Sequence, residues 1–162
     1  MSHDPPARIW MEAALAVREV RTTLPFRHPA PEDCADLAEL MFDAYRGTTD
    51  SSSIETLDDA LAETRSYFEG ESGSPLLDCS FIVEDHGLPV CASLITLYEG
   101  APLLVCSLTE PSYAGQGLAT TVVQLSMNAL AAHGHATLRL AVTRGDIAAE
   151  RVCEKLGFRE IT

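Results

Sequence analysis

The chain has 162 residues, of which 46% are apolar and 22% charged, and its formal net charge at pH 7 is −13. This length suits one domain with a buried core and is short for two. The excess of carboxylates argues against a broad nucleic-acid surface, because such binding depends on many lysine and arginine contacts to phosphates. No apolar run approaches the roughly 18 residues that cross a bilayer, and the first residues lack a targeting pattern, so we expect a cytoplasmic protein without membrane contact.

The five cysteines are odd in number and widely spaced, and no two stand at a metal-ligand interval. This pattern supports neither a disulfide framework nor a zinc site, so no metal is expected. Four of the five lie in apolar runs, where a free cysteine is usually a small buried side chain. The five are Cys34, Cys79, Cys91, Cys106 and Cys153.

The N-terminal half predicts three helices. Apolar side chains at helical spacing in residues 8–20 predict an N-terminal helix that lies on the main domain. A short strand at 24–28 precedes a second helix at 32–45. Thr56 and Asp59 can form a capping box for a third helix that reaches Phe68. The apolar positions of the first helix are Trp10, Ala13, Ala14 and Val17.

The C-terminal half predicts a sheet followed by a strand-helix-strand-helix unit. Residues 79–84, 90–98 and 103–109 are strands separated by turn signals, which favours an antiparallel meander. A helix follows from Gly117 to His133, then a strand at 137–143 and a helix that Asp146 caps and Gly157 ends. The fold class is therefore α/β (α+β), a mixed and mostly antiparallel sheet flanked by helices.

Residues 109–119 join an apolar strand to a helix through a loop with Gly115 and Gly117. Glycine adopts backbone angles that other residues avoid and lets a ligand approach the main chain. The free N–H groups of the helix start, with the positive end of the helix dipole behind them, favour an anion. A phosphate or diphosphate can bind there without a lysine.

This loop and the last helix together resemble the GNAT superfamily of N-acetyltransferases, which transfer an acyl group from coenzyme A to an amine. The family segment Q/R-x-x-G-x-G/A, which cradles the coenzyme A diphosphate, falls on residues 114–119. A second family pattern, N-x-x-A followed by Tyr and Gly-Phe, falls on 146–149, Cys153 and 157–158. The resemblance covers Leu24 to the C-terminus, and implies an N-terminal helical extension at 1–22 before a GNAT-like acyltransferase domain at 23–162.

The resemblance implies acetyl-CoA, or a related acyl-CoA, as cosubstrate. Ala114 stands where the family has Arg or Gln, so phosphate binding would depend on main-chain donors. Asp146 replaces Asn and adds a negative charge near the donor arm. The expected donor-binding residues are Leu108, Thr109, Ala114, Gly115, Gln116, Gly117, Leu118, Ala119, Thr120, Asp146, Ala149 and Arg151.

Catalytic candidates follow from the same resemblance. Cys153 occupies the position of a tyrosine that protonates the leaving thiolate in many relatives, and its alternative is a packed core thiol. Glu84, Glu99 and Glu110, near strand ends, are candidate bases for the amine, or they are solvated turn carboxylates. An acyl-cysteine intermediate is less favoured, because no histidine in the motif would activate the thiol.

Tyr45, Asp50 and Glu55 fall in the segment that resembles the acceptor-facing part of the family. Residues 32–71 hold a dozen carboxylates against Arg46 and Arg65, which would attract a cationic amine, although solvated helix faces also explain this bias.

The main hypothesis is an acyltransferase for a small amine that attacks the thioester directly. A non-catalytic acyl-CoA-binding module and a transferase with another donor, such as an aminoacyl-tRNA, are the alternatives. A homodimer is left open.

Overall fold

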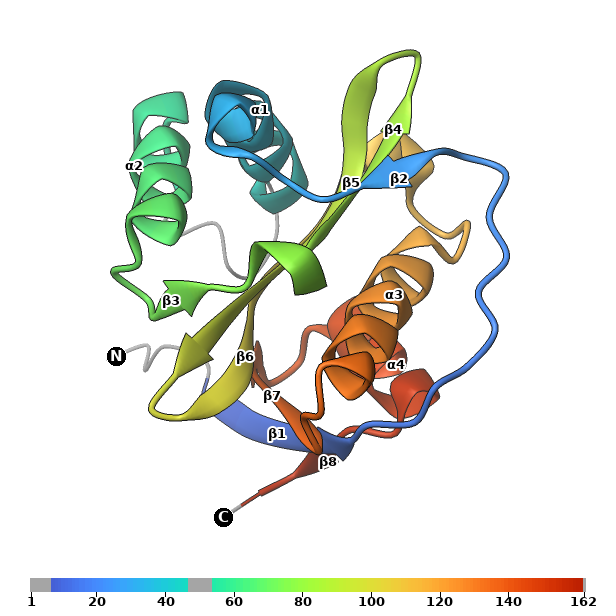
Figure 1. Cartoon of the computed structure of the whole chain (residues 1–162). Helices are drawn as coiled ribbons and strands as arrows, with labels where there is room; N and C mark the ends of the chain where they lie inside the picture. Colours follow the sequence, from blue (N-terminus) through green and yellow to red (C-terminus); the bar gives the residue numbers. More distant parts are fainter. Residues whose placement is uncertain (1–6, 47–53, 162) are drawn as a thin grey trace.

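The computed structural model describes residues 7–46 and 54–161. Within them a mixed sheet runs in the order β2-β4-β5-β6-β7-β1-β8, and β3 pairs with β5 (Figure 1). The expected antiparallel meander is confirmed in β4, β5 and β6, whereas β6 and β7 are parallel and joined through α3. The strands are β1 Arg8–Ala14, β2 Phe26–Arg27, β3 Ser74–Pro75, β4 Phe81–Asp85, β5 Leu88–Tyr98, β6 Ala101–Thr109, β7 Thr137–Thr143 and β8 Arg159–Glu160.

The described residues form four α-helices, and capping signals mark both ends of α2 and α4. The hydroxyl of Thr56 accepts from the N–H of Asp59, whose carboxylate accepts from the N–H of Thr56, so the expected capping box is confirmed. Asp146 caps the last helix and Gly157, at φ 83°, ends it. The helices are α1 Cys34–Tyr45, α2 Leu57–Glu69, α3 Leu118–Ala132 and α4 Ile147–Leu156.

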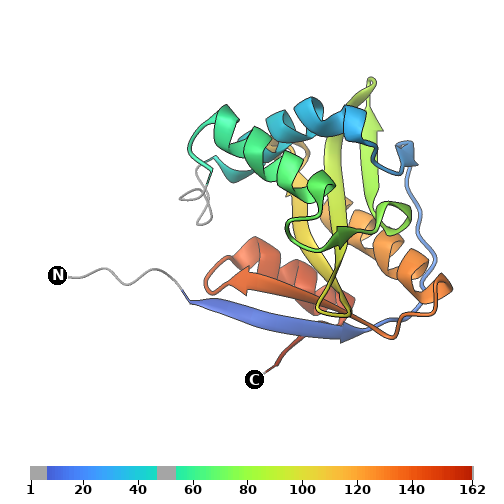
Figure 2. The same ribbon diagram turned by 60° about the vertical axis from the view of Figure 1, so that its left-hand side comes forward.

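The sheet has a core on each face. Helices α1 and α2 cover one face, and Leu37, Met41 and Tyr67 pack there against β4, β5 and β6. Helices α3 and α4 cover the other face, where Val122 and Leu138 are fully buried (Figure 2). Burying an aliphatic side chain of this size stabilises the fold by about 1.5–3 kcal/mol, so the two cores hold the helices on the sheet.

The prediction of an N-terminal helix is wrong, because residues 8–14 form strand β1. This strand lies between β7 and β8 and pairs with β7 from Arg8 opposite Thr143 to Ala14 opposite Thr137. Its side chains alternate, since Ala13 is 1% exposed whereas Trp10 is 46% exposed. Alanines fit both a helical and an alternating pattern, so pairing with β7 decides between them.

The segment between β1 and β2 runs across the outside of α3 (Figure 1). The side-chain amide of Asn128 on α3 accepts from the N–H of Arg18 at 3.0 Å and donates to its carbonyl at 2.7 Å. The guanidinium of Arg18 also donates to the carbonyl of Lys155 at 3.0 Å, near the end of α4. Residues far apart in the sequence are therefore fastened along one side of the molecule.

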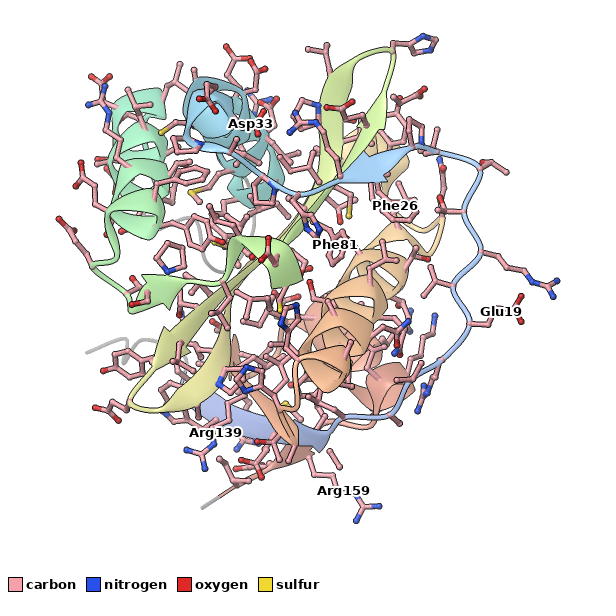
Figure 3. All side chains as sticks on the ribbon, viewed as in Figure 1. Glu19, Phe26, Asp33, Phe81, Arg139 and Arg159 are labelled. Carbon is pink, nitrogen blue, oxygen red and sulfur yellow. The ribbon has the colours of Figure 1, made fainter. Side chains whose placement is uncertain are left out.

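The short strand β2 is held by an aromatic contact and by its pairing with β4. The rings of Phe26 and Phe81 meet edge to face with their centroids 6.0 Å apart (Figure 3). This contact joins β2 to the face of the sheet that α3 covers.

Candidate active site

A cavity of about 480 Å³ opens where β6 and β7 separate. The two parallel strands pair only at Leu103 opposite Arg139, and beyond this point they diverge. Residues of β6, β7 and all four helices line the hollow between them. They include Tyr45, Glu63, Val105, Cys106, Ser107, Thr109, Ala119, Val123, Ala141, Asp146, Ala149, Val152 and Cys153.

The edge of β6 offers main-chain hydrogen-bonding groups to the cavity. Glu110 donates its N–H to the carbonyl of Val90, so the hydrogen-bonded pairs with β5 fall on alternate residues before it. The non-bonded positions between them are Ser107 and Thr109, whose N–H and C=O groups point away from β5. Since β7 has diverged there, these groups face the open edge that the cavity occupies.

A β-bulge at Val105 changes which residues of β6 face each core. Leu94 pairs with Cys106 and Ile95 with Leu104, so Val105 is the extra residue on β6. Leu104 packs on the side of α3, whereas Cys106 packs on the side of α1 and α2. The bulge therefore puts residues from both faces of the strand into the wall of one cavity.

The loop before α3 has the geometry that the glycines predict. Gly115 and Gly117 have φ values of 80° and 79°, and Gly117 is the N-cap of α3. Among the described residues, no acceptor binds the N–H groups of residues 115–120. Ala119, in the first turn of α3, lines the cavity, so this cluster of free donors adjoins it.

Cys153 is 4% exposed and lies in the cavity wall. Burial, with smaller contributions from the carboxylates of Glu150 and Asp146, raises the pKa of this thiol to about 11. The thiol is therefore protonated at neutral pH, and a protonated thiol is a poor nucleophile. Cys153 is thus a packed thiol that also lines the cavity, and its role as a proton donor stays a prediction.

Asp146 and Ala149 lie together at the start of α4. The carboxylate of Asp146 accepts from the N–H of Ala149 at 3.2 Å, and both residues line the cavity. Arg151, on the exposed side of α4, does not line it. Leu108 is fully buried in the core beneath α1, so only its main chain is available to a ligand in the cavity.

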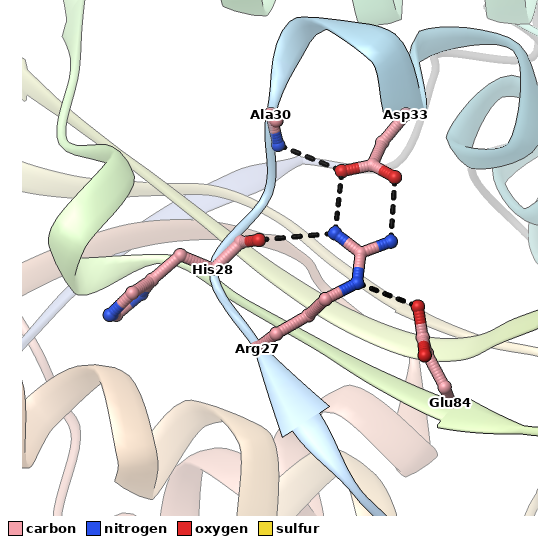
Figure 4. A network of polar contacts seen from close by, with 5 residues as sticks. All are labelled: Arg27, His28, Ala30, Asp33 and Glu84. Carbon is pink, nitrogen blue, oxygen red and sulfur yellow. Dashed lines mark hydrogen bonds and ion pairs between the residues drawn. The ribbon is translucent and has the colours of Figure 1, made fainter. Parts of the chain in front are cut away.

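Glu84 and Glu110 are both held by partners outside the cavity wall. Arg27 donates to Glu84 at 2.7 Å and forms a two-pronged ion pair with Asp33 at 2.7 and 2.8 Å (Figure 4). The guanidinium of Arg27 lowers the pKa of Asp33 below its usual range. Glu110 accepts from the N–H and hydroxyl of Ser112, which stabilises the turn before the glycine loop. A role for either glutamate as base stays a prediction.

The three residues expected to face the acceptor do not all lie at the cavity. Tyr45 lines the cavity, Glu55 is exposed outside it, and Asp50 lies outside the described residues. Glu63 on α2, which the sequence reasoning missed, lines the cavity, and its carboxylate adds to the burial that raises the pKa of Cys106 to about 12. Its position in the sequence could have indicated this, because Glu63 lies at helical spacing from the buried Ala60 and Tyr67 on one side of α2.

Two further cavity residues had no local signal. Arg8 reaches the cavity because β1 pairs with β7, and its guanidinium donates to the carbonyl of Ala141 at 3.3 Å. Ser107 belongs to the open edge of β6 and was hidden in an apolar strand. Both depend on how strands are paired, which single-residue patterns do not show.

Comparisons with known proteins agree with this geometry. The family model for FR47-like proteins matches residues 82–162, and a search of curated sequences found no match. The GCN5-related N-acetyltransferase of Sphaerobacter thermophilus has a TM-score of 0.74 at 17% identity over 96% of this chain, which spans about half (49%) of that structure's length. Within the described residues no helix is long and apolar enough to span a membrane.

Two shorter structures are similar over most of their own length. The PaiA N-acetyltransferase of Thermoplasma acidophilum, in complex with coenzyme A, has a TM-score of 0.66 at 16% identity, covering 85% of this chain and 91% of that one. The ribosomal-protein-S18-alanine N-acetyltransferase of Escherichia coli has a TM-score of 0.66 at 19% identity, covering 85% and 79%. The chain therefore belongs to the FR47-like family, within the GNAT superfamily of N-acetyltransferases.

Proposed function

We propose that the chain is an N-acyltransferase that uses acetyl-CoA, or a related acyl-CoA, to acylate a small amine. One observation carries the proposal: the cavity between β6 and β7 adjoins the unpaired N–H groups at the start of α3. A long ligand with a diphosphate in its middle fits this layout, with phosphates at the helix start and a reactive end in the cavity. A structural neighbour solved with coenzyme A supports the assignment.

The main chain would hold the donor. The N–H groups of residues 115–120 would bind the diphosphate, with the dipole of α3 behind them. The open edge of β6 at Ser107 and Thr109 would bind the amide groups of the pantetheine arm as a neighbouring strand does. An N–H group of that edge would also polarise the thioester carbonyl, so catalysis rests on positioning and on fixed dipoles.

The acceptor would enter between α1, α2 and the sheet, where Tyr45 and Glu63 line the cavity. Carboxylates in a cavity wall attract a cationic amine. Glu63 is well placed to hold the ammonium group and to accept its proton, directly or through water. The amine would then attack the thioester directly, because the buried Cys153 thiol is protonated and an acyl-cysteine step needs a thiolate.

Gly117→Val tests the phosphate loop. Gly117 has φ +79° and its missing side chain would point into open space, so valine strains the backbone and covers the N–H groups there. Gly134→Val is the matched control, because Gly134 has φ +88°, is equally open and lies beyond the other end of the same helix. Calorimetry with coenzyme A should show binding weakened at least about tenfold by G117V and unchanged by G134V, since a lost charge-assisted hydrogen bond costs about 1.5–3 kcal/mol.

Thiol release from acetyl-CoA with a panel of amines tests the reaction itself. Turnover with small cationic amines is the expected result. Coenzyme A binding without turnover over a broad panel would favour the non-catalytic module, and unchanged binding by G117V would exclude the loop as the diphosphate site. Salt-sensitive retention of aminoacyl-tRNA in place of coenzyme A would favour the third class.

A further inference from the structure

Two charged side chains at the cavity, of opposite sign, have no ion pair. Within the described part of the chain three charged residues line it, and one of them, Asp146, is engaged as the cap of α4. The other two, Arg8 on β1 and Glu63 on α2, form no ion pair within residues 7–46 and 54–161. The cavity therefore offers one positive and one negative group to a ligand.

Arg8 faces the same side of the sheet as α1 and α2. Ile9 and Ala13 of β1 are buried in the core beneath α3 and α4, and side chains alternate along a strand, so Arg8 belongs to the opposite face. Helix α3, whose start would hold the diphosphate, packs on the face of Ile9 and Ala13. Arg8 is therefore directed toward the acceptor side of the cavity and not toward the phosphates.

The guanidinium of Arg8 keeps most of its hydrogen-bonding capacity. Among the described residues it donates one hydrogen bond, to the carbonyl of Ala141 on β7 at 3.3 Å, whereas a guanidinium has five N–H donors. The chain has 24 acidic residues against 11 lysines and arginines, yet none of the described ones pairs with Arg8. Its planar fork matches the two oxygens of a carboxylate, which a ligand can supply.

Glu63 and Arg8 reach the cavity from the two sides of the split between β6 and β7. Helix α2 packs with α1 over β4, β5 and β6, whereas β1 is paired with β7 on the side away from β6. The apolar side chains of Met41, Ile54 and Val105 also line the cavity. A ligand that spans it thus meets a carboxylate, a guanidinium and apolar surface.

We propose that the acceptor is an amino acid, whose ammonium group is held by Glu63 and whose carboxylate is bound by Arg8. The inference rests on the proposed function and narrows its small amine to one that carries a carboxylate. The nitrogen bonds to the acyl carbon and the carbon–sulfur bond breaks, so one ammonium proton ends on the coenzyme A thiol and another leaves through Glu63 to water. The product, an N-acyl amino acid, has lost its positive charge, so Glu63 no longer attracts it and its release is favoured.

Pairs of acceptors that differ only in the carboxylate test the inference, by thiol release from acetyl-CoA on the full chain. Leucine with leucinamide and β-alanine with β-alaninamide are two such pairs. The carboxylate preference of a pair is kcat/KM for the acid divided by kcat/KM for the amide. At least one acid should be acylated, and in its pair Arg8→Gln should lower the preference about tenfold, as expected for a charge-assisted contact that water partly screens. Comparing variant with wild type cancels the different intrinsic reactivities of the two amines.

Two further variants separate the two ends of the site. Glu63→Gln should lower kcat/KM for the acid and the amide by similar factors, because both carry the amine, and so leave the preference within about twofold of wild type. Arg8→Lys keeps the charge without the planar fork and should retain part of the preference. The unfolding curve of Arg8→Gln should match that of the wild type, because the Arg8 side chain is exposed.

Arg159→Gln is the matched control, because it removes an exposed positive charge from β8, beside β1 but outside the cavity (Figure 3). An equal fall of the preference in this variant would reduce the effect to net charge and overturn the inference. An unchanged preference in Arg8→Gln, or acylation of amides and other amines but of neither acid, would also overturn it, while the proposed function would stand. If no amine at all were acylated, the proposed function and this inference would both fail.

Discussion

The Cys153 thiol lines the cavity, and its protonated state limits its possible roles in catalysis. With a pKa of about 11 it is almost entirely protonated at neutral pH, which disfavours it as a nucleophile. The same value makes it a weak acid toward a leaving thiolate, because an ordinary thiol has a pKa near 8.5. We therefore expect Cys153 to contribute little as a proton donor and mainly to fill space in the wall of the cavity.

Cys153→Ala should retain turnover to within about threefold from pH 7 to pH 10, whereas loss of a working general acid costs about 10²–10⁴-fold. The measurement is kcat for thiol release across that range. Cys91→Ala, at an equally buried site outside the cavity, controls for lost packing. A large loss of kcat confined to Cys153→Ala would show that the thiol donates the proton.

Strand β1 shows most clearly how far local patterns carry. The meander, α3, β7 and α4 could be predicted because caps, turns and glycines with positive φ act over a few residues. For the same reason the glycine loop could be located in the sequence. β1 could not be predicted, because Ala13 and Ala14 satisfy both periods and only the distant β7 decides between them. The same holds for Arg8, which enters the cavity wall through that pairing.

The sequence identified acidic candidates but not what surrounds them in the fold. Sequence position put Glu84 near a strand end, but Arg27, 57 residues earlier in the chain, binds it in the fold. Glu63 had the right spacing to border the buried face of α2, yet its position over the cavity depends on how α2 packs against the sheet. Ion pairs and cavity walls are tertiary features. Residue type and spacing therefore suggest which side chains could act in a site, but they do not predict which groups lie around them.

Two substitutions in β1 test whether this segment is a strand or a helix. Ala13→Asp puts a charge into the core, where Ala13 is 1% exposed, and should lower the free energy of unfolding by about 3 kcal/mol or more. Ala14→Asp places the same side chain on the exposed face and should change it by less than about 0.5 kcal/mol. Chemical denaturation measures both. Equal effects would contradict the alternation, because the helical pattern puts both alanines on one face.

At the scale of the whole molecule, the buried thiols make stability depend on alkaline pH. The chain has a single lysine, so cysteines and its four tyrosines are most of the side chains that change charge between pH 8 and pH 10.5. Burial raises the pKa of Cys91 to about 11 and that of Cys106 to about 12, and it also raises the pKa of Tyr67. These thiols stay neutral in the fold while the unfolded chain ionises, so stability is full below the unfolded pKa near 9 and falls above it.

Guanidinium denaturation at pH 8 and at pH 10.5 should show this loss. Each of the two thiols contributes a fall of about 2 kcal/mol in the free energy of unfolding over this range. Cys91→Ala is less stable at pH 8, because it leaves a small cavity, but its further loss at pH 10.5 should be smaller by about 2 kcal/mol. An identical fall in both proteins would show that Cys91 does not resist ionisation.

The position of β1 between β7 and β8 also sets an order of events during synthesis. Ala14 pairs with Thr137, which is added to the growing chain 123 residues later, and Met11 pairs with Glu160. Strand β1 must therefore wait, unpaired, until residues 137–160 have left the ribosome. Pairing over such a sequence distance is slow. The nascent chain can form its meander early, but the hollow between β6 and β7 gains its outer wall, and with it Arg8, only after residues 137–143 have been made.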